Sequence, residues 1–344
     1  MNLNLTQIKN ITIGAVRVTE NENGFDFFRF TEQQEQLYKH RSDDFYAKTF
    51  CSSGIKLYFI TNSEKLFLKA LISNASSRSY FSYDLFVNGK KADSLTNFID
   101  TELPINYTKV QFPVGEVSKQ FILSPGEKEV CIHFPWSVKS TLKELVLDDN
   151  AFLKPIKPRY KLLCFGDSIT QGYDALYTSS KYTSQLASAL NAEEYNKAIG
   201  GEIFFPQLAS AKEDFVPDFI TVAYGTNDWN RCTREEFTHN CKDFFYNLNL
   251  SYPNSKVFAI TPIWRKELHE YRQFGEFKGI GEIIKNTAGQ FKNITIINGF
   301  DFVPQNESLF ADLRLHPNDK GFGYYYKNLA SQIKINGLKP LQRV

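Results

Sequence analysis

Four short motifs in the second half of the chain contain the residue types that acyl transfer requires. That chemistry needs a nucleophile, a base that takes its proton, and hydrogen-bond donors aimed at the oxyanion of the tetrahedral intermediate. Ser168 supplies a hydroxyl as nucleophile, and His316 supplies an imidazole as base. The motifs are Gly166-Asp167-Ser168, Asn196 to Gly201, Gly225-Thr226-Asn227-Asp228 and Asp312 to Pro317.

The second and third motifs offer the donors for an oxyanion hole. We expect the backbone N–H groups of Ser168 and Gly201 and the side-chain amide of Asn227 to serve. A glycine at position 201 lets a backbone amide approach the substrate without a Cβ in the way. An amide at position 227 donates without carrying charge. The carboxylates of Asp167 and Asp228 are expected to bind loop backbone instead of taking part in the chemistry.

In this order the four motifs resemble those of the SGNH (GDSL-type) hydrolases, a flavodoxin-like family of esterases and lipases. The resemblance covers roughly residues 161–333. Each motif alone is weak evidence, because Gly-Asp-Ser is also an ordinary turn sequence. Carried over position by position, the resemblance implies Ser168 as nucleophile, Gly201 and Asn227 in the oxyanion hole, and His316 as base.

The acid that orients the histidine is less regular. In the family it usually stands three residues before the histidine, where this chain has Leu313, while Asp312 stands four before. Either the loop bulges by one residue or the acid is missing, as in some sugar deacetylases of the family that orient a Ser–His pair with a backbone carbonyl. We predict Asp312 as the third member of a triad.

Three further side chains are predicted to contact substrate. Trp264 and Arg265 follow the apolar run of residues 256–261, where they can stack on a sugar ring and pair with a polar group. Tyr173 follows the nucleophile and can line the cleft. The alternative for Trp264 and Tyr173 is packing within the protein.

These motifs require a sheet whose strand ends meet at one edge. From Tyr160 onward apolar runs alternate with helical stretches, which predicts a doubly wound parallel sheet, and the resemblance to SGNH hydrolases implies that this sheet is flavodoxin-like. Thr233 and Glu236 form a capping box that marks one helix start. The expected strands are 161–165, 194–197, 219–223, 256–261 and 294–297, and the expected helices are 178–190, 234–248, 279–291 and 318–333.

Residues 1–150 lack helical periodicity and are predicted to form a β-sandwich or jelly roll. Asn88-Gly89 between two apolar runs predicts a hairpin. Pro155 and Pro158 indicate a linker over residues 151–159, which leaves 160–344 as the hydrolase domain. The expected strands are 55–61, 66–73, 83–87, 109–112, 129–134 and 140–147.

Composition limits the partners. The 344 residues are 42% hydrophobic and 23% charged, and the net charge of +2 favours neither a nucleic-acid nor an anionic-membrane partner. Five scattered cysteines indicate free thiols in a reducing compartment, and the amino terminus lacks the pattern of a signal peptide, so we expect a cytoplasmic protein. We expect no metal and no cofactor, because the mechanism requires neither.

A β-sandwich ahead of an SGNH domain resembles carbohydrate esterase family 2 and related deacetylases. The resemblance implies a serine esterase that removes small acyl groups, acetyl above all, from a carbohydrate, with an oligosaccharide or small-molecule ester as substrate. This step is analogy, since a fold does not fix its substrate. The alternatives are a lipase or thioesterase acting on longer acyl chains and a non-catalytic carbohydrate-binding protein.

Overall fold

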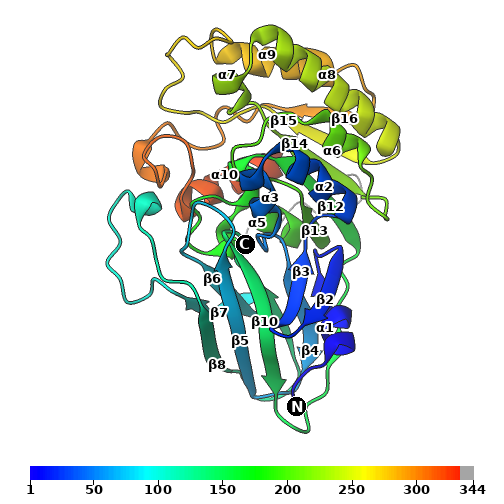
Figure 1. The fold of residues 1–344 in the computed structure, drawn as a ribbon, viewed down its shortest axis with the longest axis vertical. Coiled ribbons are helices and arrows are strands. Elements are labelled where there is room, and N and C mark those ends of the chain that lie inside the picture. Colours follow the sequence, from blue (N-terminus) through cyan, green and yellow to red (C-terminus); the bar gives the residue numbers. More distant parts are fainter. Residues whose placement is uncertain (334–344) are drawn as a thin grey trace.

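The computed structural model describes residues 1–333, and Figure 1 shows two packed antiparallel sheets at one end and a parallel sheet with helices at the other. The final residues of the predicted hydrolase domain, 334–344, lie outside the described residues. Within the described chain, no helix is long and apolar enough to cross a membrane.

The parallel sheet has the strand order β13-β12-β14-β15-β16, and all of its neighbouring strands run parallel. The first strand in the chain lies between the second and the third, which is the flavodoxin-like order with a switch point beside β12. The predicted fold class is therefore confirmed. The strands are β12 (Tyr160–Gly166), β13 (Ala192–Asn196), β14 (Phe219–Ala223), β15 (Lys256–Ile260) and β16 (Ile294–Ile297).

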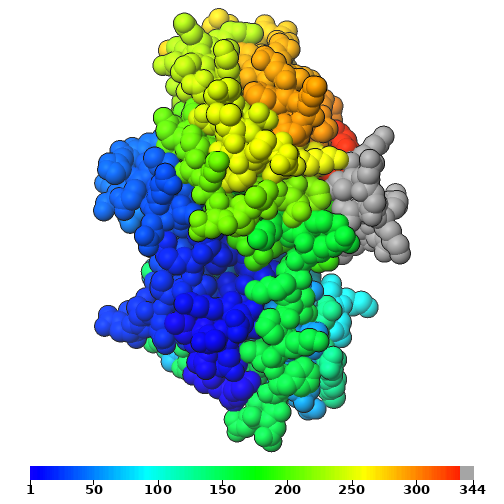
Figure 2. Space-filling view, turned by 90° about the vertical axis from the view of Figure 1, so that its right-hand side faces the viewer, coloured from blue at the N-terminus to red at the C-terminus, as the bar shows by residue number. Residues whose placement is uncertain are grey.

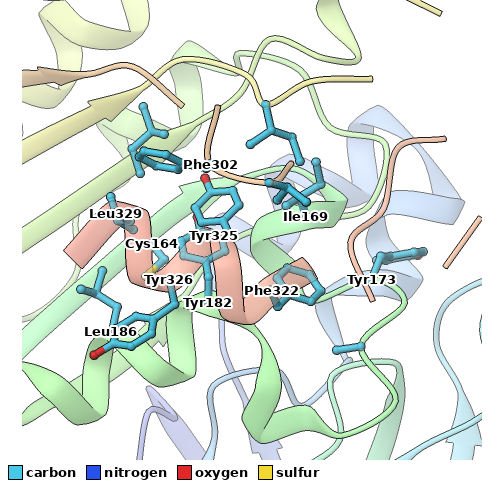
Figure 3. Close-up of a cluster of buried hydrophobic side chains, with 14 of the residues drawn as sticks. Cys164, Ile169, Tyr173, Tyr182, Leu186, Phe302, Phe322, Tyr325, Tyr326 and Leu329 are labelled. Carbon is cyan, nitrogen blue, oxygen red and sulfur yellow. The ribbon is translucent and has the colours of Figure 1, made fainter. Parts of the chain in front are cut away.

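Alternating side chains of this sheet enter two separate cores, because successive residues of a strand face opposite sides. On β12, Leu162 and Cys164 pack with α5 and α10, whereas Leu163 and Phe165 pack with α6, α8 and α9. Figure 3 shows part of the first core, in which the ring of Tyr182 stacks on that of Tyr325. The helices are α5 (Tyr182–Ala189), α6 (Pro206–Ser210), α8 (Arg234–Ser251), α9 (Lys278–Ala288) and α10 (Asp319–Gln332).

The N-terminal sheets have the orders β1-β4-β9-β6-β7, with β11 beside β4, and β2-β3-β10-β5-β8. The predicted hairpin is confirmed, since Asn88 and Gly89 connect β6 to β7 with positive φ at both residues. The strands are β1 (Thr12–Ile13), β2 (Arg17–Asn21), β3 (Gly24–Phe28), β4 (Lys56–Thr61), β5 (Lys65–Asn74), β6 (Ser82–Val87), β7 (Lys90–Thr96), β8 (Glu116–Ile122), β9 (Lys128–His133), β10 (Val138–Leu147) and β11 (Lys154–Pro155).

Several details of this region differ from the sequence-based expectation. Residues 109–112 form no strand, and a short 3-10 helix, Tyr107–Lys109, overlaps their start. The segment expected as a linker contributes β11, in which Pro155 occupies an edge position that needs no backbone N–H. Three helices were not predicted: α1 (Leu5–Ile11), α2 (Glu32–Arg41) and α3 (Asp43–Thr49).

Helices α2 and α3 lie against the parallel-sheet end of the molecule. Phe30, Tyr38 and Phe45 are buried in the same core as α6 and α8, and Gln34 Nε2 donates to the Ala211 carbonyl over 2.8 Å. In Figure 2 the blue surface of the N-terminal third reaches up beside the green surface of the parallel-sheet end. The N-terminal region therefore contributes directly to the surroundings of the strand ends.

Candidate active site

Ser168 stands at the carboxyl end of β12, on the first residue of the short helix α4 (Ser168–Gln171). Asp167 caps this helix, and its Oδ1 accepts from the Ile169 N–H over 3.0 Å. Gly166 must lack a side chain here, because an added Cβ would come within 2.2 Å of Thr170 Oγ1. The turn thus fixes the backbone on both sides of the Ser168 hydroxyl.

The structure brings Ser168, His316 and Asp312 into one chain of hydrogen bonds. His316 Nε2 lies 2.8 Å from Ser168 Oγ, and His316 Nδ1 lies 2.8 Å from Asp312 Oδ2. With Nδ1 protonated and facing Asp312, Nε2 is free to accept the serine proton. The three groups therefore have the geometry that a hydroxyl nucleophile and its base require.

A local bulge allows Asp312 to reach the histidine from four residues away. Leu313 adopts φ = +60°, a left-handed conformation that is uncommon outside glycine and asparagine. The loop closes around the carboxylate, whose Oδ1 accepts from the backbone N–H groups of Arg314, Leu315 and His316 over 3.0, 2.8 and 3.0 Å. Of the two alternatives left open by the sequence, the structure has the bulged loop.

The same contacts shift both ionisations in the direction that favours an ion pair. Burial alone would raise the pKa of Asp312, but the hydrogen bond and charge of His316 and the loop N–H groups outweigh it, and the pKa is lowered. Burial alone would lower the pKa of His316, but the Asp312 hydrogen bond and the charges of Asp174 and Asp312 outweigh it, and the pKa is raised. A stronger base results at His316.

The two other predicted oxyanion donors follow neighbouring strands. Gly201 has φ = +88°, and its carbonyl accepts from the exposed Arg231 Nη1 over 2.7 Å. A Cβ at this position would make only ordinary contacts, the nearest at 3.4 Å, so glycine is required for its φ and not, as we expected, for close approach. Asn227 Nδ2 donates one hydrogen to the Glu202 carbonyl over 2.9 Å, and an amide carries a second hydrogen.

Cations of the N-terminal region hold the loop that carries Gly201. The buried guanidinium of Arg29 donates to the carbonyls of Asn196 and Ala198 over 2.6 and 3.1 Å. On α3, Lys48 Nζ donates to the Gly200 carbonyl over 3.0 Å. These contacts fix the backbone of the loop that carries Gly201. They were not predicted, because residues 1–150 were expected to supply strands alone.

The two aspartates expected to bind backbone do so. Asp167 accepts from Ile169, as described above, and Asp228 Oδ1 accepts from the Phe204 N–H over 2.9 Å. Burial raises the pKa of each carboxyl group to about 7. Both carboxylates therefore hold backbone in place, within one turn at Asp167 and between two segments of the chain at Asp228.

The predicted substrate contacts are less exposed than expected. Arg265 is 1% exposed, and its guanidinium donates to the Thr226 carbonyl over 3.0 Å and pairs with Glu267 over 3.2 Å. Trp264 is 8% exposed and packs on Phe310. Both side chains belong to the interior, because the run that precedes them ends inside the fold. We therefore do not retain Arg265 or Trp264 as substrate contacts.

Tyr173 lies beneath the site. It is 4% exposed, and its ring centroid is 5.7 Å from that of His316 and 4.8 Å from that of Trp136. Its ring also occupies the space that a Cβ on Gly200 would need, at 2.5 Å. Tyr173 thus contacts both the His316 ring and the loop that carries Gly200 and Gly201.

Sequence reasoning missed one side chain that contacts His316. Asp174 is fully buried, and its Oδ2 lies 3.2 Å from His316 Nδ1. Among the described residues, Asp174, Asp312 and His316 form the one group of acidic and imidazole atoms close enough to surround a metal ion. The hydrogen bond between Asp312 and His316 and the ion pair of Asp174 with Arg78 account for these atoms without one.

Residues 164–323 match the GDSL-like Lipase/Acylhydrolase family. The match confirms the resemblance of this part of the chain to SGNH (GDSL-type) hydrolases, and it supports an ester hydrolase. A comparison with curated proteins found no match.

Several solved structures are similar to this protein over nearly the whole chain. A salicylyl-acyltransferase from a tetracycline biosynthetic pathway is 16% identical with a TM-score of 0.76, and the match covers 96% of each chain. A family two carbohydrate esterase from Clostridium thermocellum, in complex with cellohexaose, is 14% identical with a TM-score of 0.64, covering 94% of this chain and 98% of that one. An acetyl xylan esterase from Butyrivibrio proteoclasticus is 16% identical with a TM-score of 0.59, covering 96% and 97%. At these identities the likeness shows the fold.

Proposed function

We propose that the protein is a serine esterase that removes small acyl groups, acetyl above all, from a carbohydrate through an acyl-enzyme. The observation that supports this reaction best is the chain of two 2.8 Å contacts from Ser168 Oγ through His316 to Asp312. These hydrogen bonds lie at the switch point of an open parallel sheet, and proteins of this architecture bind their substrates there.

The mechanism follows from the two nitrogen atoms of His316. Ser168 Oγ attacks the acyl carbon while Nε2 takes the hydroxyl proton, and Asp312 stabilises the imidazolium that results. The oxyanion receives hydrogen bonds from the N–H groups of Ser168 and Gly201 and from the second amide hydrogen of Asn227. His316 then returns its proton to the departing alcohol oxygen. Water attacks the acyl-enzyme by the same steps and releases the acid and free Ser168.

The polar rim of the site supports a small acyl group on a polar alcohol. Arg231 is exposed beside Gly201, and the side chain of Arg314 is 49% exposed next to Asp312. A long acyl chain would have to pack along these charges without gaining burial, whereas hydroxyl groups can pair with them. The carbohydrate esterases named above are similar in fold, which favours the same substrate class by analogy.

The test begins with Ser168→Ala and the hydrolysis of a simple acetyl ester. We expect activity to be lost while the circular-dichroism spectrum stays unchanged, because alanine fills the same buried position without the hydroxyl. Substantial activity in the folded variant would refute the assignment of Ser168. If the wild-type protein hydrolyses none of the esters tested, the non-catalytic carbohydrate-binding alternative would be favoured.

The acyl group is tested with acetyl, butyryl and octanoyl esters of one alcohol, followed by acetylated oligosaccharides. We expect kcat/KM to fall as the acyl chain becomes longer. Because burial of each added methylene contributes only about 0.8 kcal/mol, steric exclusion must set the limit on chain length. A steady rise to octanoyl would favour the lipase alternative. Because a salicylyl-acyltransferase is similar in fold, each assay is repeated with an added alcohol, and transfer in preference to hydrolysis would reassign the acceptor.

A further inference from the structure

His316 Nδ1 faces two carboxylates from different parts of the chain. Asp312 Oδ2 lies at 2.8 Å and Asp174 Oδ2 at 3.2 Å. A triad of the usual kind places one carboxylate at this nitrogen. Asp174 follows the nucleophile helix by three residues and adopts φ = +72°, a left-handed conformation that turns the chain sharply there.

Asp174 is held by side chains of the N-terminal region. Arg78 donates to both of its oxygens, from Nε over 2.6 Å and from Nη2 over 3.1 Å, and the Tyr80 hydroxyl donates to Oδ1. The Tyr107 hydroxyl donates to the Asp174 carbonyl over 2.5 Å. Trp136 Nε1 donates to the next carbonyl, that of Ala175, over 2.8 Å.

This number of partners exceeds what a turn needs. A buried carboxylate requires pairing, and the bidentate contact with Arg78 already supplies it. The contact with His316 is therefore additional, and it directs a negative charge at the proton that the base must retain. Asp174 therefore links the N-terminal region to the proposed base, because it pairs with Arg78 on one side and contacts His316 on the other.

We propose that Asp174 is a positioning residue whose negative charge, 3.2 Å from His316 Nδ1, supports the imidazolium beside the hydrogen bond from Asp312, and that Arg78 and Tyr80 of the N-terminal region hold it in place. This proposal rests on the proposed function of His316. It makes the N-terminal region part of the proton-transfer apparatus of the hydrolase, and it leaves His316 Nδ1 facing a second anion if the charge of Asp312 is lost.

Other charged groups also face His316 and must be considered in any test by pH. They lie on its own loop, on the nucleophile turn and on the loop between β5 and β6. The anions raise the pKa of His316 and the cations lower it, so removal of an anion and removal of a cation should shift this pKa in opposite directions. The groups are the anions Asp312, Asp174 and Asp167 and the cations Arg78 and Arg314.

The experiment measures kcat/KM of an acetyl ester against pH for Asp174→Asn, Asp312→Asn and the double variant. Neutral His316 is the active form, so the rate falls on the acid side. Loss of the Asp174 charge should move this acid limb to lower pH by about 1 unit. Asp312→Asn should lose less than the roughly 10⁴-fold typical of a triad with one carboxylate, and the double variant should approach that loss.

Tyr107→Phe is the matched control, because it removes a hydrogen bond from the same residue without changing a charge. It should leave the acid limb in place. If Asp174→Asn does not fold, Arg78→Gln serves instead, since loss of this cation should move the acid limb to higher pH. An unmoved limb in folded Asp174→Asn or Arg78→Gln would overturn the proposal.

The double variant supplies a second criterion. Equal rates for the double variant and Asp312→Asn would also overturn the proposal, because Asp174 would then add nothing. These outcomes differ from failure of the proposed function itself. In that case His316→Ala would retain activity, and the wild-type protein would lack an acid limb.

Discussion

Replacement of Gly201 by alanine separates two reasons for a glycine in the proposed oxyanion loop. At φ = +88°, an alanine is strained whatever the available space. The nearest atom to its Cβ would be Arg231 Nη2 at 3.4 Å, an ordinary contact at the end of a flexible side chain. The substitution therefore adds backbone strain without a clash, and the question is whether the loop moves to relieve it.

The hydrogen bonds on this loop decide the answer. A left-handed conformation costs an alanine roughly 1–2 kcal/mol. Against this, three charged side chains hold the loop at four carbonyls: Arg29 at Asn196 and Ala198, Lys48 at Gly200, and Arg231 at Gly201 itself. A hydrogen bond to a charged group contributes about 1.5–3 kcal/mol. Their sum exceeds the strain, so we expect the loop to stay in place.

Gly201→Ala should therefore lower the melting temperature by about 2–8 °C and reduce kcat less than tenfold. The measurements are thermal unfolding and the hydrolysis of one acetyl ester. Gly200→Ala is the matched comparison, since its Cβ would meet the Tyr173 ring at 2.5 Å. That ring lies beside His316, so this variant should lose both stability and most of its activity.

The reasoning is refuted by one pattern of results. If Gly201→Ala keeps its melting temperature and loses about 10²–10³ in kcat, the loop has moved and the donor with it. The charged contacts would then be weaker than their geometry indicates.

Three further outcomes are expected. Asn227→Ala should reduce kcat by about 10²–10³ with little change in KM, and a small loss would remove Asn227 from the oxyanion hole. The pKa of His316 is raised and its neutral form is the base, so kcat/KM should fall below a midpoint pH that lies above 6.5. A midpoint pH below 6.5 would contradict the ion-pair geometry. Arg265→Met should destabilise the fold by about 1–3 kcal/mol in denaturant unfolding, because the Thr226 carbonyl loses its donor. A higher KM with unchanged stability would instead show that Arg265 contacts the substrate.

The elements around the site could be predicted because their signals are local. The apolar runs of the parallel strands lie within a few residues of the observed bounds, and the capping box of Thr233 and Glu236 marks the start of α8. The same rule would have found α2, since Thr31 and Gln34 form a capping box of the same kind. That helix was missed because its region was interpreted by its strands alone.

The remaining features depend on contacts that no local pattern reveals. Leu313 gives no sign of a left-handed conformation, so the distance of Asp312 from His316 left two alternatives open. Asp174 meets Arg78 across 96 residues of sequence, and an isolated aspartate after a Gly-Tyr pair looks like a turn. Arg265 follows a strand like a surface residue, yet its guanidinium is 1% exposed.

Arg29 shows why the two predicted domains depend on each other. It comes from the N-terminal region and is buried, and burial lowers its pKa only to about 10, so it keeps its charge at neutral pH. That charge faces carbonyl groups from both regions, those of Lys48 and Cys51 on one side and those of Asn196 and Ala198 on the other. A buried cation is tolerated only while such acceptors surround it. The N-terminal region and the loop that carries Gly201 therefore stabilise one another, and the hydrogen bonds of Arg78 and Tyr80 to Asp174 link the same two regions a second time.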